Sequence, residues 1–167
     1  TLDFLDREIR PQRTVLVTFS AAAIEGRRAT MLEQARLGGW ISVVGAPDLQ
    51  SAMRVVSGGV DYLGGFERGV RFGFQEIQGV EVDMDRAAQD ALEHRLAFLE
   101  DARRDMAAIE IPITWVHGRF DAWMDLERAR DVLSSGNSAN RRLLVVPTGH
   151  QLRSSREALD VFQLIAA

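Results

Sequence analysis

Hydrophobic residues gather in four short runs along the chain, and longer stretches of mixed apolar and polar residues separate them. The runs cover residues 14–19, 40–46, 111–116 and 142–146. Each is short and apolar, and the first three are rich in β-branched residues, a composition typical of strands buried in a parallel sheet. The four runs therefore predict four strands, and we expect the first to be buried on both faces.

The stretches between and beside these runs have helical composition. Gly38-Gly39 and Gly58-Gly59 each end one of the predicted helices, because glycine readily adopts the left-handed conformation found after helix ends. The predicted helices cover residues 2–9, 21–37, 48–56, 84–108, 125–133 and 154–166.

Strands that alternate with helices predict an α/β fold, in which a parallel sheet carries helices on both faces. Residues 58–80 depart from this alternation, because they are rich in glycine and aromatic residues. We expect an irregular, cap-like insertion over residues 58–83 within one domain that covers residues 1–167.

A nucleophile, an acid and a base follow three of the predicted strands. Ser20 follows the first run directly, Asp121 comes shortly after the third, and His150 comes after the fourth. Parallel sheets place their ligands at the carboxyl edge. Histidine takes the serine proton and a carboxylate orients the imidazole, so these residue types suit acyl transfer. Their order along the chain is that of α/β-hydrolases, and we predict a catalytic triad.

Each of these residues also has a simpler interpretation. The elbow pattern G-x-S-x-G is degenerate here, because Thr18 stands at its first glycine position and Ala22 at its last. Ser20 and Asp121 are both acceptable helix caps, and His150 is acceptable as a loop residue. Asp125 is a competing acid, but we expect it to lie in the helix and face away.

The net charge and the residue content argue against several classes of function. The net charge is −4 and there is no cysteine, which argues against nucleic-acid binding and excludes thiolate chemistry. Three histidines without ligand-like spacing predict no metal site, and we expect no cofactor. His94 is expected at a helix surface and His117 near the acid, where it could line a pocket. No run approaches a membrane span, and a cytoplasmic location is the default expectation.

Three stretches carry a resemblance to a known family. They are VTFSA at residues 17–21, ISVVGAPDLQSAMRVVSGGVDYLG at residues 41–64, and FDAWM at residues 120–124 followed later by GH at residues 149–150. The chain resembles the acyl-transferase/thioesterase of the bacterial bioluminescence fatty-acid reductase system, an α/β-hydrolase. The resemblance implies the C-terminal part of that fold, with Ser20 as nucleophile, Asp121 as acid and His150 as base.

The resemblance also implies a substrate pocket and an incomplete oxyanion hole. Residues 48–80 are expected to shape an acyl pocket, with Tyr62, Phe66, Phe72 and His117 as its candidate residues, although core packing explains the aromatic residues equally well. The Ala21 N–H is expected to be one oxyanion donor. A second donor is expected from a loop that precedes the nucleophile in family members, so we expect the chain to be N-terminally incomplete or to work beside a partner chain.

Together these expectations predict an enzyme that forms an acyl-enzyme on Ser20. It would hydrolyse an acyl thioester or ester, or transfer the acyl group to another acceptor. Acyl-carrier protein or coenzyme A is the expected carrier. One alternative is another α/β-hydrolase activity on the same triad, such as that of a carboxylesterase or a lactonase. A second alternative is a hydrolase-like interaction domain that has no activity.

Overall fold

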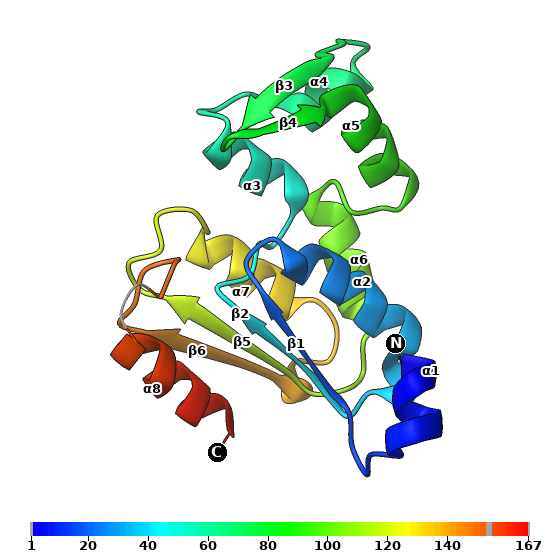
Figure 1. The fold of residues 1–167 in the computed structure, drawn as a ribbon, viewed down its shortest axis with the longest axis vertical. Coiled ribbons are helices and arrows are strands. Elements are labelled where there is room, and N and C mark those ends of the chain that lie inside the picture. Colours follow the sequence, from blue (N-terminus) through cyan, green and yellow to red (C-terminus); the bar gives the residue numbers. More distant parts are fainter. Residues whose placement is uncertain (1, 153–154, 167) are drawn as a thin grey trace.

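A four-stranded parallel sheet forms the base of the molecule in the computed structural model, which describes residues 2–152 and 155–166. Its strands lie in the order β1-β2-β5-β6, and all neighbours are parallel. A smaller layer stands above the carboxyl edge of this sheet (Figure 1). The strands of the main sheet are β1 (Val15–Phe19), β2 (Gly39–Val43), β5 (Ile113–Gly118) and β6 (Arg141–Val146).

Three helices cover one face of the sheet. They are α2 (Ala22–Glu33), α6 (Leu99–Ala108) and α7 (Leu126–Ser134). Trp40 of β2 and Trp115 of β5 fill the space beneath them, with their rings edge to face and their centroids 5.9 Å apart. Both rings are buried with Met106 of α6 and Val132 of α7, so this face holds the largest apolar cluster.

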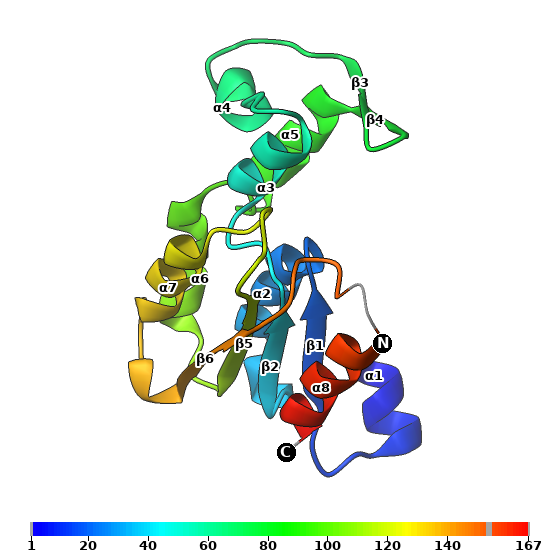
Figure 2. The same cartoon turned by 90° about the vertical axis from the view of Figure 1, so that its left-hand side faces the viewer.

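The opposite face is covered by α8 (Ser155–Ala166), whose Val161 packs on Val43 and Val116 of the two central strands. Figure 2 shows α8 on one side of the sheet and α6 and α7 on the other. The predicted α/β fold with helices on both faces is therefore confirmed.

Strand β1 lies at one edge of the sheet. Its Val15, Val17 and Phe19 are 40%, 42% and 39% exposed, whereas Thr18 on the opposite face is buried. The prediction that this strand is buried on both faces is wrong, because Val161 of α8 packs on the central strands. Phe162 of α8 contacts the Phe19 ring, with the centroids 5.9 Å apart, but Phe19 stays 39% exposed.

The upper layer, called the cap layer here, runs from α3 to α5. Its elements are α3 (Leu49–Val56), α4 (Tyr62–Glu67), the antiparallel hairpin of β3 (Phe74–Ile77) and β4 (Val80–Asp83), and α5 (Met84–Glu93). The prediction of an irregular segment over residues 58–80 is wrong, because α4 and the hairpin are regular. Glycines at 58, 59, 69, 73 and 79 have positive φ and make the turns between these short elements.

The single helix predicted over residues 84–108 is also wrong. The structure has two helices, α5 and α6, because the chain turns at Arg95, whose φ is 56°. The Leu96 N–H then bonds back to the Ala91 carbonyl at 2.8 Å. Ala97 is fully buried in this turn against Ala88 and Leu63, so packing inside the cap layer ends the helix.

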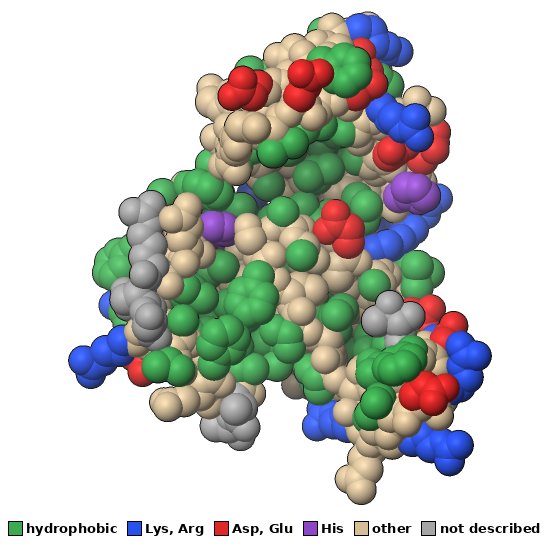
Figure 3. Space-filling model, viewed as in Figure 1, with side chains coloured by type: hydrophobic (Ala, Val, Ile, Leu, Met, Phe, Trp, Pro, Cys, Tyr) green, Lys and Arg blue, Asp and Glu red, His purple; other side chains and the backbone are tan. Residues whose placement is uncertain are grey.

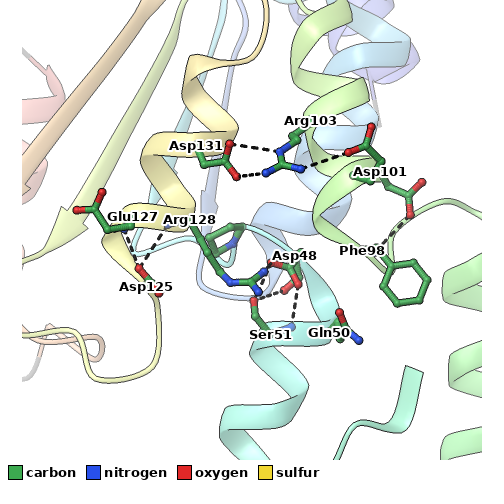
Figure 4. Close-up of polar contacts among 12 residues, drawn as sticks. Asp48, Gln50, Ser51, Phe98, Asp101, Arg103, Asp125, Glu127, Arg128 and Asp131 are labelled. Carbon is green, nitrogen blue, oxygen red and sulfur yellow. Dashed lines mark hydrogen bonds and ion pairs between the residues drawn. The ribbon is translucent and has the colours of Figure 1, made fainter. Parts of the chain in front are cut away.

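Asp48 fixes the point where the chain enters the cap layer. Its carboxylate is fully buried, accepts the Ser51 N–H at 2.8 Å and thereby caps α3, and pairs with Arg128 of α7 at 2.8 Å (Figure 4). The Gln50 N–H donates to the Ala97 carbonyl at 2.9 Å and so joins the entering and leaving segments. The start of the cap layer is therefore held to the base by Asp48, and its leaving segment is held to its entering segment.

The remaining elements are short. The N-terminal residues form α1 (Leu2–Phe4) and a wider helical turn, Leu5–Ile9, in line with the predicted helix over residues 2–9. Single 3₁₀ turns cover Gln34–Arg36 and Ser138–Asn140. Among the described residues, no helix is long and apolar enough to cross a membrane.

A buried ion cluster joins α2 to α6. Asp105 of α6 is 2% exposed and accepts hydrogen bonds from Arg27 and Arg28 of α2. Arg27 is 1% exposed and also donates to the Pro47 carbonyl at 2.9 Å. Burial lowers the pKa of Arg27, whereas the Asp105 carboxylate opposes this shift. The Asp105 carboxylate therefore compensates the buried positive charge of Arg27.

The variant Asp105→Ala is expected to lower the free energy of unfolding by about 3–5 kcal/mol, because it leaves a buried guanidinium unpaired. Denaturant unfolding followed by circular dichroism measures this change. The matched control is Glu127→Ala, which removes the exposed pair with Arg130 and is expected to cost about 0–1 kcal/mol. Equal losses in the two variants would contradict the structural role of the buried cluster.

Candidate active site

The structure brings Ser20, Asp121 and His150 together at the carboxyl edge of the main sheet. Ser20 Oγ lies 2.7 Å from His150 Nε2. His150 Nδ1 lies 2.8 Å from Asp121 Oδ2. When the imidazole carries its hydrogen on Nδ1, it donates to the carboxylate and leaves Nε2 free to accept the serine hydroxyl. The three residues come from loops that follow β1, β5 and β6, so the parallel pairing of these strands creates the arrangement.

Ser20 sits in a strained turn between β1 and α2. Its φ is 53°, in the left-handed region that residues with a Cβ avoid. The Ser20 carbonyl accepts the N–H of Ala23 at 3.1 Å and of Ala46 at 3.0 Å, and its own N–H donates to the Val43 carbonyl. Three backbone hydrogen bonds hold the strained conformation, which turns the hydroxyl toward His150.

The structure explains why a β-branched residue occupies the first glycine position of the elbow motif. A Cβ on Gly26 of α2 would lie 2.4 Å from Thr18 Cγ2, so the glycine that allows close packing is on the helix instead of the strand. The Thr18 hydroxyl also accepts the Trp40 indole N–H at 2.9 Å. The degenerate motif is therefore compensated by Gly26, and no reading of the motif alone reveals this.

Asp121 is held as a carboxylate. Its Oδ1 accepts the Trp123 and Met124 N–H groups at 2.9 and 3.0 Å, and its Oδ2 accepts from His150. Burial opposes ionisation, but the hydrogen bonds from His150 and from the two backbone N–H groups together lower the pKa of Asp121. The Asp121 carboxylate is therefore charged at neutral pH and pairs with Nδ1 of the imidazole.

Asp125 has a different role. It is the N-cap of α7, where its carboxylate accepts the Glu127 N–H at 2.7 Å, so it stands at the start of the helix and not within it as predicted. Helix α7 begins at Leu126, so the alternative in which Asp121 caps a helix from Ala122 is wrong.

Ala21 follows Ser20 directly, so its backbone N–H lies at the strained turn. Among the described residues it has no hydrogen-bond partner, and Ala21 is exposed. An exposed backbone N–H beside Ser20 is chemically suited to donate to a negatively charged oxygen. Its role as an oxyanion donor stays a prediction.

Two of the histidines lie outside the triad. His117 is in β5, is 2% exposed, and has no partner for Nδ1 among the described residues. Burial lowers the pKa of His117, against the opposing field of Asp121, so it stays neutral. His94 lies exposed at the end of α5. His117 therefore belongs to the sheet interior below the acid.

The predicted aromatic pocket residues lie within the cap layer. Tyr62 and Phe72 pack edge to face with centroids 4.8 Å apart, and the Phe72 ring fills the space beside Gly65. Phe66 lies under the Arg71 guanidinium, at 4.2 Å. The structure places these side chains in the packing of the cap layer.

An apolar cavity with a volume of about 200 Å³ lies in the cap layer, partly within the segment 48–80 that was predicted to shape a pocket, but its lining residues were not predicted. Hydrophobic side chains gather below the hairpin, in the hollow between the cap layer and the base (Figure 3). Leu49 also packs on Ile24 and Ala46, beside the Ser20 turn. The cavity is lined by Leu49, Met53, Leu63, Ile77, Val82, Met84, Ala87 and Ala88.

A second unpredicted feature is Trp123, whose ring stacks on that of His150. The centroids are 4.9 Å apart and the planes are 25° from parallel. The residue lies in the loop after β5, where composition carries no signal for a contact with a histidine 27 positions later in the sequence.

Known structures with this fold include several hydrolases. The esterase domain of a Rhodothermus marinus protein matches with a TM-score of 0.61 and 13% identity, over 98% of this chain and 62% of that one. Alpha/beta hydrolase domain-containing protein 10 from mouse matches with a TM-score of 0.66 and 11% identity, over 99% and 65%. The thioesterase domain from the curacin biosynthetic pathway matches with a TM-score of 0.55 and 17% identity, over 99% and 70%.

These comparisons establish the class of fold: the chain has the fold of the α/β-hydrolases. It spans less than two thirds of the first two matching chains, at 62% and 65%. No family model and no curated protein sequence matches it. The finer resemblance to the bioluminescence acyl-transferase/thioesterase is not confirmed and stays a prediction.

The strained turn generates a stability prediction. The variant Ser20→Gly is expected to have a free energy of unfolding about 1 kcal/mol higher than that of Ser20→Ala, because only glycine adopts a positive φ without strain. Chemical denaturation measures both variants, which lack the same hydroxyl. The control is Ala29→Gly on the exposed side of α2, where the change is expected to lower stability by about 0.5–1 kcal/mol. Equal stability of the two Ser20 variants would contradict the strain.

Proposed function

We propose that this chain is a serine hydrolase that cleaves an ester or thioester through an acyl-enzyme on Ser20, and passes the acyl group to water or to another acceptor. The continuous hydrogen-bond chain from Asp121 through His150 to Ser20, at 2.8 and 2.7 Å, carries the proposal. These distances place a base on the nucleophile and an orienting carboxylate on the base, as this chemistry requires.

Acylation begins when His150 Nε2 takes the proton of the Ser20 hydroxyl. The oxygen attacks the carbonyl carbon of the substrate, and a tetrahedral oxyanion forms. The imidazolium is stabilised by the Asp121 carboxylate. It then donates its proton to the departing alcohol or thiol, and the acyl group remains on Ser20.

Deacylation repeats these steps with a second nucleophile. Water or an acceptor alcohol loses its proton to His150 Nε2 and attacks the acyl-enzyme. The second oxyanion collapses, and the proton returns to Ser20. His150 therefore acts as base and then as acid in each half of the cycle.

The oxyanion requires donors aimed at the position where its charge develops. The Ala21 N–H is one, and we propose that the second comes from polypeptide that lies along the open edge of β1, either the N-terminal remainder of the fold or a partner chain. The exposed Val15, Val17 and Phe19 support this proposal, because an uncovered apolar strand is unfavourable in water. One missing donor lowers the rate by about 10²–10³-fold.

The apolar cavity supports an acyl group as the bound part of the substrate. An engineered apolar cavity of about 150 Å³ binds benzene, so the cavity of about 200 Å³ suits a short alkyl chain or a single ring. Leu49 joins its wall to the residues packed beside the Ser20 turn. We therefore propose acyl esters or thioesters, carried by acyl-carrier protein or coenzyme A, as the substrate class.

The first test of the proposal is fluorophosphonate labelling of the full chain. Wild type is expected to label and Ser20→Ala to remain unlabelled. The variant Asp121→Asn is expected to label about 10⁴-fold more slowly, because the imidazole is no longer held in the productive tautomer. The labelling rate is measured by gel fluorescence against time.

The matched control for the acid is Asp125→Asn, which keeps the helix cap and is expected to label at the wild-type rate. Equal slowing in both Asn variants would contradict the assignment of Asp121. Labelling is measured without and with the polypeptide proposed to cover β1, and an unlabelled Ser20 in both samples would contradict the enzyme and support an interaction domain. Turnover of acyl thioesters compared with simple esters separates a thioesterase from a carboxylesterase or lactonase.

The cavity predicts a dependence on acyl length. The kcat/KM for a series of p-nitrophenyl esters is expected to rise about fourfold for each methylene until the cavity is full. The variant Ala87→Leu fills part of the cavity and is expected to move the optimum to a shorter chain. Val80→Leu, on the exposed side of the hairpin, is the control and is expected to leave the optimum unchanged. An unshifted optimum in Ala87→Leu would place the acyl group elsewhere.

A further inference from the structure

Trp123 contacts both partners of the candidate nucleophile. Its indole ring stacks on the His150 imidazole, with the centroids 4.9 Å apart and the planes 25° from parallel. Its backbone N–H donates to Asp121 Oδ1 at 2.9 Å. The acid's other oxygen, Oδ2, accepts from His150. One residue therefore touches the acid through its backbone and the base through its side chain.

Packing holds the indole in place. Trp123 lies against a buried cluster that includes Ile24 of α2, Ala46 of the loop after β2, and Ala52 of α3. The Ala46 N–H in turn donates to the Ser20 carbonyl. The ring is therefore fixed against the same backbone that holds the nucleophile, and it is half-buried, so water reaches only part of it.

We propose that Trp123 is a positioning residue for His150, a role that rests on the proposed function. The stacked ring restricts rotation of the imidazole about its own axis. Because Nδ1 and Nε2 lie in the plane of the imidazole, this restriction keeps both nitrogens aligned with Asp121 and Ser20. Less conformational entropy is then lost when His150 takes up the position from which it removes the Ser20 proton.

The stack also acts on the charge that develops on His150 in the transition state. His150 is neutral before it takes the serine proton and positively charged afterwards, and the face of an indole attracts a cation. The contact therefore strengthens as the transition state forms. Interactions that are stronger in the transition state than in the ground state act on kcat and leave KM unchanged. A change in kcat without a change in KM therefore distinguishes the proposed role from an effect on substrate binding.

The experiment compares Trp123→Leu with Trp123→Phe in the full chain, with p-nitrophenyl acetate, whose acyl group is too small to need the cavity. The Leu variant is expected to lower kcat roughly tenfold with KM unchanged. The Phe variant restores an aromatic face and is expected to recover most of the loss. Trp123→Met, with a long flexible apolar side chain, replaces the Leu variant if that one does not fold.

The control is Phe120→Leu in the same loop, which alters a side chain that is 68% exposed and is expected to leave kcat and KM at wild-type values. Unchanged kcat in Trp123→Leu would overturn the proposal. Equal losses in the Phe and Leu variants, together with an equal drop in the unfolding midpoint, would also overturn it in favour of a packing role. Failure of wild type to label at Ser20 would instead overturn the proposed function.

Discussion

The parallel pairing of β1, β2, β5 and β6 determines where every candidate catalytic side chain lies. In this register Phe19 pairs with Val43, and Val43 pairs with Val116, so the strands end at one common edge. Side chains from loops more than a hundred residues apart then meet within hydrogen-bond distance. The valine- and tryptophan-rich layers on the two faces of the sheet stabilise this pairing, and the site depends on them.

Strain and close packing concentrate at that edge. Ser20 and Val44 both have positive φ, at 53° and 45°. A Cβ on Gly45, the next residue, would lie 2.0 Å from Ser42 Oγ and 2.8 Å from the Ala23 Cβ. The backbone after β2 can therefore approach the Ser20 turn only because position 45 is glycine. Strain of this kind persists where surrounding contacts over-determine it, and it is typical of functional sites.

The cap layer is linked to the same edge by charges and apolar contacts. The Asp48–Arg128 pair joins the start of α3 to α7, and Trp123 lies between α3 and the imidazole. Leu49, which binds the substrate's acyl group in our proposal, thus shares a packed cluster with Trp123, which stacks on the His150 imidazole. The position of the cap layer and the geometry of the candidate triad are for this reason mechanically connected.

The sequence by itself determined the four strands, most helices, and the order and strand-end positions of Ser20, Asp121 and His150, because these follow from local composition and strand polarity. Three further features were decided only by the tertiary structure. Gly26 accommodates Thr18, packing around Ala97 divides the predicted long helix, and Trp123 stacks on the His150 imidazole. Each of these depends on contacts between residues distant in sequence, and local periodicity carries no signal for such contacts.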